Sequence, residues 1–202
     1  KRGLAGLQLP PGGDPFMKAA LAGSAGGRWV VGAFFHCWSL RAVMKFVSFA
    51  GFEEYLDGLG LFSMQLGLSR MHEALGRLGL GRPGRLVAHV VGTNGKGSTS
   101  GFLEALARGH GVSTGLYISP HLVGVRERIR VRGRMLPEER WLQEANAVMG
   151  ACADVGLTYF ELLTVMALRI FGREGLDLAV LEAGLGGTHD ATCAVDADLA
   201  VM

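Results

Sequence analysis

The stretch VAHVVGTNGKGSTSGFLEAL, residues 87–106, constrains the fold of this 202-residue chain more than any other. An apolar run with the length of a buried strand ends at Gly92, and a helical pattern follows Lys96. Glycines between the two allow the backbone to approach a ligand closely, and a helix N-terminus presents free N–H groups to an anion. A strand, a glycine-rich loop and a helix in this order therefore predict an α/β domain with a phosphate-binding site.

The loop does not match the usual P-loop pattern, G-x-x-x-x-G-K-[ST]. Val90 stands where the first glycine would be, and Gly97 separates Lys96 from the first hydroxyl, Ser98. The alternative is a glycine-rich turn with a surface lysine. The strand before the loop and the helix after it favour a nucleotide site of another kind.

Apolar runs and helical patterns alternate along the rest of the chain. Each apolar run is nearly continuous, which is typical of strands that are buried on both faces of a parallel sheet. The predicted class is α/β, P-loop-containing, with a mostly parallel sheet and helices on both faces. Strands are expected within residues 85–92, 112–119, 127–136, 176–184 and 197–202, and helices within residues 52–59, 68–78, 98–108, 137–153 and 160–171.

Three polar or glycine-rich loops follow predicted strands, at residues 92–98, 119–122 and 183–190. Ligands of such sheets bind at the carboxyl ends of the strands, so we expect these loops to converge on one site. Glu182 ends a strongly apolar strand, where an unpaired buried carboxylate would be costly. A Mg²⁺ ion would explain it, and the alternative is a carboxylate that accepts hydrogen bonds from loop N–H groups. Ser119 then becomes a candidate second Mg²⁺ ligand.

Other polar residues of these loops have more than one interpretation. Lys96 can reach terminal phosphates, and Ser98 can cap the helix or approach Mg²⁺. His121 is a candidate substrate contact or a structural histidine. A metal cluster of Glu182, His189 and Asp190 is a weaker alternative, because the glycines between them impose no fixed geometry.

Composition excludes little. The formal net charge is +2, and the only basic run, residues 126–134, alternates with apolar residues and predicts an amphipathic strand with a solvated basic face. We therefore expect neither a nucleic-acid partner nor a membrane partner. The apolar stretch at 29–40 is shorter than the ~20 residues of a membrane span. Three scattered cysteines favour a reducing, cytoplasmic setting.

Residues 1–43 differ from the rest of the chain. They are rich in Gly, Ala and Pro and lack a clear period, whereas Met44 opens a stretch that resembles a natural start. We expect residues 1–43 to be an atypical leader, either an upstream extension or a weakly ordered segment, and residues 44–202 to form the α/β domain.

Six runs in order resemble the folylpolyglutamate synthase and dihydrofolate synthase family, within the Mur ligase superfamily. They are QLGLSRM, HVVGTNGKGSTS, GLYISPHL, ERIRVRG, LTYFE and VLEAGLGGTHDAT, and the resemblance covers residues 52–202. The family's loop has a glycine after the lysine, as at Gly97, whereas muramyl-peptide ligases more often have a hydroxyl there. The resemblance therefore favours the folate branch and implies the ATP-binding central domain of that superfamily.

The resemblance implies an ATP-dependent carbon–nitrogen ligase. ATP would phosphorylate a carboxylate of folate or pteroate, and the amino group of L-glutamate would attack the acyl phosphate, releasing ADP and phosphate. The implied cofactors are ATP and Mg²⁺, and the full-length enzyme is expected to be a monomer. The implied site residues are Lys96 and Glu182 for catalysis; Gly92, Thr93, Asn94, Gly95, Lys96, Gly97, Ser98 and Thr99 for ATP; Ser119 and Glu182 for metal; and Gln65, Leu66, Gly67 and His121 for substrate.

The sequence departs from the family pattern in several places. Gln65 stands where bifunctional bacterial members have an acidic residue, and Thr188 and Cys193 replace an arginine and an asparagine. The family's C-terminal domain would lie beyond Met202, so we expect a truncated chain that does not catalyse alone. The alternatives are a muramyl-peptide-type ligase and a non-catalytic ATP-binding remnant.

Overall fold

The computed structural model describes residues 45–60, 67–187 and 189–202. The predicted leader at 1–43 and the predicted substrate residues Gln65 and Leu66 lie outside these ranges. In the described part of the chain, no helix is long and apolar enough to cross a membrane.

The centre of the fold is a six-stranded sheet in the order β4-β3-β2-β5-β1-β6. Strand β5 pairs in parallel with β1 and β2, and β1 pairs in parallel with β6. Strand β3 pairs antiparallel with both β2 and β4, so the sheet is mixed but mostly parallel, as predicted. The strands are β1 (Leu86–Val90), β2 (Thr114–Tyr117), β3 (Ile129–Val131), β4 (Arg134–Met135), β5 (Leu178–Glu182) and β6 (Leu199–Val201).

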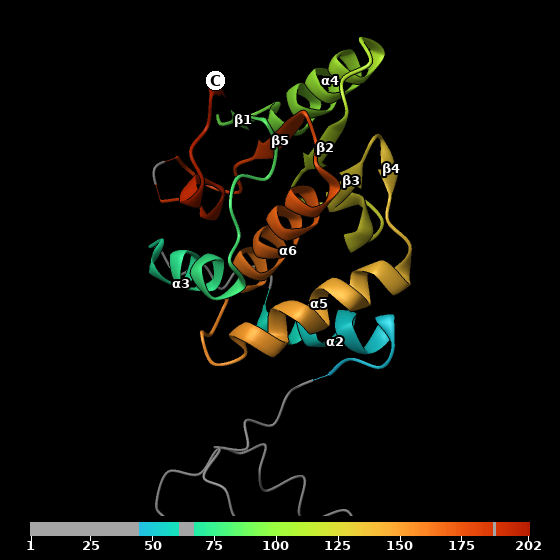
Figure 1. The fold of residues 1–202 in the computed structure, drawn as a ribbon, viewed down its shortest axis with the longest axis vertical. Coiled ribbons are helices and arrows are strands. Elements are labelled where there is room, and N and C mark those ends of the chain that lie inside the picture. The colour runs from blue at the N-terminus through green and yellow to red at the C-terminus, as the bar shows by residue number, and fades with distance from the viewer. Residues whose placement is uncertain (1–44, 61–66, 188) are drawn as a thin grey trace, which may run out of the picture. The chain divides into compact units, whose positions relative to one another are not determined.

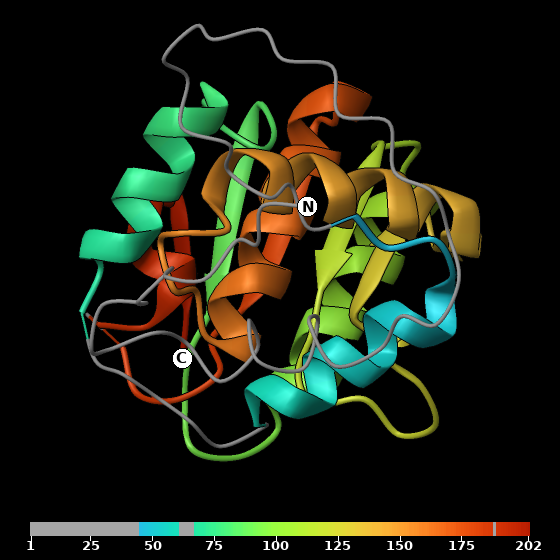
Figure 2. The same cartoon turned by 90° about the horizontal axis from the view of Figure 1, so that it is seen from below.

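Helices cover both faces of the sheet, which confirms the predicted layers. Helix α4 packs on β5 and β2 from one face, whereas α6 packs on β2 from the other and is itself covered by α5 and α2 (Figure 1). Seen from this second side, α5 and α6 lie in front of the strands (Figure 2). The helices are α2 (Phe49–Leu59), α3 (Ser69–Leu78), α4 (Lys96–Gly109), α5 (Glu138–Cys152) and α6 (Tyr159–Glu174).

Local signals explain where these helices begin and end. Thr158 caps α6 in a capping box with Glu161, so that two free N–H groups at the helix start gain acceptors. Gly79 ends α3 in the left-handed conformation, at a φ of 60°, which glycine adopts at little cost. The same Glu161 accepts two hydrogen bonds from Arg70, at 3.0 and 2.9 Å, which tie α3 to the start of α6.

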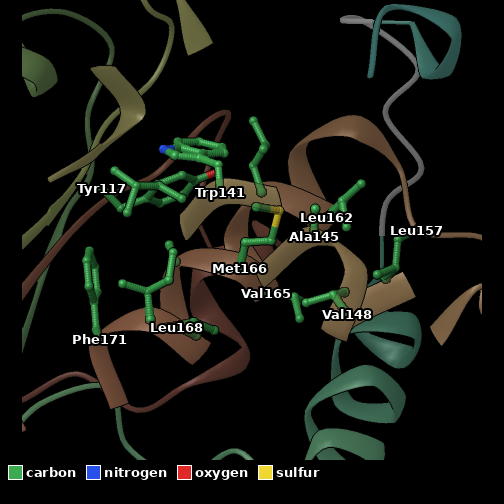
Figure 3. Packing of buried hydrophobic residues seen from close by; sticks show 14 of the residues in the cluster. Tyr117, Trp141, Ala145, Val148, Leu157, Leu162, Val165, Met166, Leu168 and Phe171 are labelled. Atoms are coloured by element: carbon green, nitrogen blue, oxygen red, sulfur yellow. The ribbon is translucent and has the colours of Figure 1, made fainter. Parts of the chain in front are cut away.

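The main hydrophobic core lies between the sheet and the layer of α6, α5, α3 and α2. Figure 3 shows side chains that fill it, among them Trp141, Met166 and Phe171. Helix α6 approaches the sheet closely at Gly115 of β2. A Cβ atom at that position would lie 2.7 Å from Leu176 and 2.8 Å from Phe171, so the glycine is required by packing.

The core under α4 is smaller and consists of Val90, Leu116 and Val180. Two apolar residues that helped predict this helix, Phe102 and Leu106, are exposed. The helix instead buries Glu104, which accepts a 2.6 Å hydrogen bond from the Thr114 hydroxyl, so apolar spacing predicted the helix but not its buried face.

The basic run at 126–134 is not one amphipathic strand. Residues Val125–Arg128 form a 3₁₀ helix, η1, which precedes β3, and Gly133 lies in the turn to β4. The prediction of a solvated basic face is wrong at Arg128, which is 3% exposed. The 3₁₀ turn changes the direction of this side chain relative to its neighbours.

Candidate functional site

The three predicted loops meet at one edge of the sheet. They follow β2, β5 and β1, which are neighbours and run parallel, with Val90 opposite Glu182 and Tyr117 opposite Leu181. Because parallel strands end on the same side, the loops after them come together. The predicted convergence at 92–98, 119–122 and 183–190 is therefore present in the tertiary structure.

The loop after β1 has the geometry that its glycines predict. Gly92 has a φ of 137° and Gly95 a φ of 76°, in a region that side-chain-bearing residues rarely adopt. Helix α4 begins at Lys96, two residues before the predicted start at Ser98, and no side chain caps it. Its first N–H groups are therefore open to a ligand. They lie at the positive end of the helix dipole, which favours an anion.

A cavity of about 420 Å³ lies between this loop and the loop after β5. One wall is formed by Gly92, Thr93 and Lys96, and the other by residues 185–187. Thr93 and Asn94 in the loop, and Ser98 and Thr99 in the first turn of α4, are exposed. Three of the predicted phosphate-binding residues, Gly92, Thr93 and Lys96, thus line an open space beside the start of α4.

Glu182 lies where the three loops meet. It is 3% exposed, and its Oε2 accepts a 2.9 Å hydrogen bond from the backbone N–H of Ser119. A Cβ atom at Gly97 would lie 3.6 Å from both carboxylate oxygens, so the absence of a side chain there leaves space beside them. Ser119 and Glu182, predicted as a pair, are brought together.

The charge state of Glu182 is set by competing effects. Burial raises its pKa above the ordinary value for a glutamate, whereas the Ser119 N–H and the nearby charges of Lys96 and Arg128 act in the opposite direction. A buried carboxylate whose ionised form is only partly compensated is stabilised further by a bound cation. The oxygens of Glu182 and Ser119 are of the type that Mg²⁺ prefers, so the residues fit a divalent ion.

Asp190 organises the loop after β5. Its Oδ2 accepts hydrogen bonds from the N–H groups of Gly184 and Leu185, and its Oδ1 accepts from the backbone and hydroxyl of Thr192. The alternative cluster of Glu182, Asp190 and His189 is wrong, because no three His, Cys, Asp or Glu side chains in the described ranges are placed to hold a metal ion.

His121 and Arg128 form a pair beside Ser119. The Nε of Arg128 donates a 2.9 Å hydrogen bond to Nδ1 of His121, and its guanidinium lies 5.1 Å from the ring centre of Tyr159. Sequence reasoning included His121 but missed Arg128, because the alternation around it indicated an exposed strand. Of the predicted substrate loop, only Gly67 is described, with a φ of 127°.

Comparisons with known proteins identify the relatives of this chain. No family model matches it. The dihydrofolate synthase/folylpolyglutamate synthase of Escherichia coli K12 is 44% identical over 153 residues, which are 76% of this chain and 36% of the relative. Human mitochondrial folylpolyglutamate synthase is 43% identical over 116 residues, which are 52% of this chain and 19% of the relative.

Solved structures agree in fold. The structure of E. coli FolC in complex with DHPP and ADP has a TM-score of 0.72 at 43% identity, over 76% of this chain and 37% of that one. A bifunctional folylpolyglutamate synthase/dihydrofolate synthase with Mn, AMPPNP and L-glutamate bound has a TM-score of 0.73 at 38% identity, over 78% and 38%. The chain therefore spans a little over a third of the length of these bacterial relatives.

The mostly parallel sheet, with its glycine loop at the start of α4 and a carboxylate at the end of β5, defines an α/β domain of the Mur ligase type. The similarity is concentrated in the folate branch of that superfamily. The chain belongs to the folylpolyglutamate synthase/dihydrofolate synthase family.

Proposed function

We propose that this chain supplies the phosphate-binding part of an ATP-dependent ligase that joins L-glutamate to a folate or pteroate acceptor. The observation that carries the proposal is the position of Glu182, buried beside Ser119, Gly97 and Lys96 in a chain of this family. Related structures contain ADP, or AMPPNP with Mn, so both ligand classes suit this fold.

In the proposed reaction, an oxygen of the acceptor carboxylate attacks the γ-phosphorus of ATP. The bond from this phosphorus to the β,γ-bridging oxygen breaks, and that oxygen leaves with the electron pair on ADP. The amine of glutamate then attacks the acyl carbon of the acyl phosphate. Phosphate leaves with the electrons of the C–O bond, and the amine loses its proton to solvent.

The residues of this chain would act on charge and position. The N–H groups of the loop and of the α4 N-terminus would hold the phosphates, and Lys96 would offset charge that builds up on the transferring group. Glu182 and Ser119 would hold Mg²⁺, which supplies further charge neutralisation when bound. The open backbone at Gly95 and Gly97 allows phosphate oxygens to approach within hydrogen-bond distance.

Nucleotide binding tests the proposal on the chain itself. We expect isothermal titration to show that the wild-type chain binds Mg·ATP. In Lys96→Ala the affinity should fall by roughly tenfold or more, which is the scale of one charge-assisted contact to phosphate. Lys45→Ala is the matched control, because Lys45 is an exposed lysine distant in sequence from the loop. Unchanged affinity in Lys96→Ala would exclude the loop as the phosphate site.

The acceptor class needs a separate measurement. We expect tetrahydrofolate, but not a UDP-linked muramyl peptide, to raise the thermal midpoint of the chain in the presence of Mg·AMPPNP. The opposite preference would assign the site to the cell-wall branch. Stabilisation by the nucleotide and by neither acceptor would favour a non-catalytic nucleotide-binding role.

A further inference from the structure

Arg128 is a nearly buried cation with an incomplete set of partners. Only 3% of the residue is exposed, yet in the described part of the chain no carboxylate forms an ion pair with it. Arg70, by contrast, forms an ion pair at 2.9 Å with the buried carboxylate of Glu161. Removing a guanidinium from water without a counter-charge is costly, so an anion is expected to complete this environment.

Two side-chain contacts hold the guanidinium in place, and a backbone contact fixes the segment that carries it. Its Nε donates to His121, and one face lies over the ring of Tyr159. The carbonyl of Arg128 also accepts a 3.0 Å hydrogen bond from the N–H of Ile118, which fixes η1 against the end of β2, one residue before Ser119. A cation restrained in this way loses little conformational entropy when it binds an anion.

The contacts of Arg128 also line an open space. A cavity of about 320 Å³ is bordered by His121 and Tyr159, together with the segment 123–125 and part of α2. Since Arg128 can only donate, Nδ1 of His121 must carry the lone pair that accepts its hydrogen bond. In the neutral ring the proton is then on Nε2, so His121 is itself a donor.

The lining of this cavity is also acidic in part. It carries Glu53 and Asp57 from α2, and these carboxylates would repel an anion placed near them. The cavity therefore does not suit a free polyanion. It suits an elongated ligand whose single carboxylate lies beside His121, the lining residue that Arg128 contacts.

We propose that Arg128 binds the acceptor carboxylate that becomes phosphorylated, with His121 as a second donor. The inference deepens the proposed function and rests on it. The guanidinium donates to one carboxylate oxygen while the other attacks the γ-phosphorus of ATP, and after transfer it donates to the carbonyl oxygen of the acyl phosphate. No proton leaves Arg128 in either state. Lys96 thus acts on the phosphoryl group that is transferred, and Arg128 acts on the carboxylate that receives it.

The test compares a folyl acceptor with a free γ-carboxylate and the same acceptor as its γ-amide. Affinities are measured by isothermal titration in the presence of Mg·AMPPNP. The wild-type chain is expected to bind the acid at least tenfold more tightly than the amide, and Arg128→Gln is expected to bind both with the lower affinity of the amide. Arg128→Lys, which keeps the charge, should recover part of the preference.

Controls separate this inference from the proposed function. Arg126→Gln should bind both acceptors as the wild type does, because Arg126 lies on the same 3₁₀ helix but is paired with Glu138 at 3.7 Å. Arg128→Gln should still bind Mg·ATP, because the phosphate-binding loop is intact, and its thermal midpoint shows whether the fold is kept. If Arg128→Gln does not fold, the inference is tested by Arg128→Lys and by the affinities of the wild type for the acid and the amide.

Two results would overturn the assignment of Arg128: equal affinity of the wild type for acid and amide, or an undiminished preference for the acid in a folded Arg128→Gln. Neither result depends on Lys96. Failure of the proposed function would instead appear as Mg·ATP binding that does not respond to Lys96→Ala.

Discussion

Replacement of Gly97 by alanine should separate stability from ligand binding. Gly97 is the second residue of α4, and its φ does not lie in the positive region, so alanine fits the backbone. The new Cβ would lie 3.6 Å from both oxygens of Glu182, an ordinary contact distance that requires no movement of the neighbour. The substitution is therefore compatible with the fold but fills space beside the carboxylate.

The two effects have opposite signs. Alanine in a helix is favoured over glycine by roughly 0.5–1 kcal/mol, which corresponds to a rise in thermal midpoint of about 1–4 °C for a chain of this size. Mg²⁺ lies about 2.1 Å from its oxygen ligands, so an ion on the Gly97 side of the carboxylate would overlap the new methyl group. We expect the affinity for Mg·ATP to fall by about tenfold, or about 1.4 kcal/mol.

Thermal unfolding followed by circular dichroism and titration with Mg·ATP measure the two effects. Gly101→Ala is the matched control, because it lies on the same helix and a Cβ there would meet nothing within 4 Å. It should gain similar stability and keep its affinity. An unchanged affinity in Gly97→Ala would show that no ligand occupies the space between Gly97 and Glu182, and would refute the proposed geometry of the metal site.

Three further predictions concern stability. The Glu127 carboxylate accepts hydrogen bonds from backbone N–H groups that lower its pKa. Its contribution to folding stability is therefore present above pH 4.5 and is lost as the pH falls through the lowered pKa. The difference in thermal midpoint between wild type and Glu127→Gln should vanish in acid, and a difference that stays constant with pH would contradict this. Gly115→Ala would place a Cβ 2.8 Å from Phe171 and should cost about 1–3 kcal/mol in urea unfolding, whereas a neutral effect would show that α6 can move away. Arg70→Ala leaves the buried Glu161 without its bidentate partner and should cost about 1–3 kcal/mol in the same assay; a change below about 0.5 kcal/mol would show that the pair does not anchor α3.

Much of the fold followed from local patterns. Continuous apolar runs identified the strands, and the glycines around Lys96 identified the loop and the helix after it. The convergence of Ser119 and Glu182 could also be predicted, because parallel strands bring the loops after them to one edge. These features depend on backbone geometry and on the order of elements, which the sequence encodes directly.

Features that depend on which face is covered could not be predicted. Spacing showed that residues 98–108 form a helix, yet Phe102 is exposed and Glu104 buried, because hydrogen bonding to Thr114 satisfies the carboxylate in the interior. From the sequence, Asp190 was a candidate metal ligand. In the structure the loop after β5 surrounds it and supplies four hydrogen-bond donors to its carboxylate.

By itself, the sequence determined the class of fold, the glycine loop and its distinction from a P-loop, and the family. Only the tertiary structure decided that Gly97 lies against the Glu182 carboxylate, and that Arg128 is buried beside His121 while Arg126 and Arg130 stay partly exposed. The physical reason is that periodicity reports the direction of side chains along one element. The environment that gives a charge its function is assembled from segments far apart in the chain, here η1, the end of β2 and the start of α6.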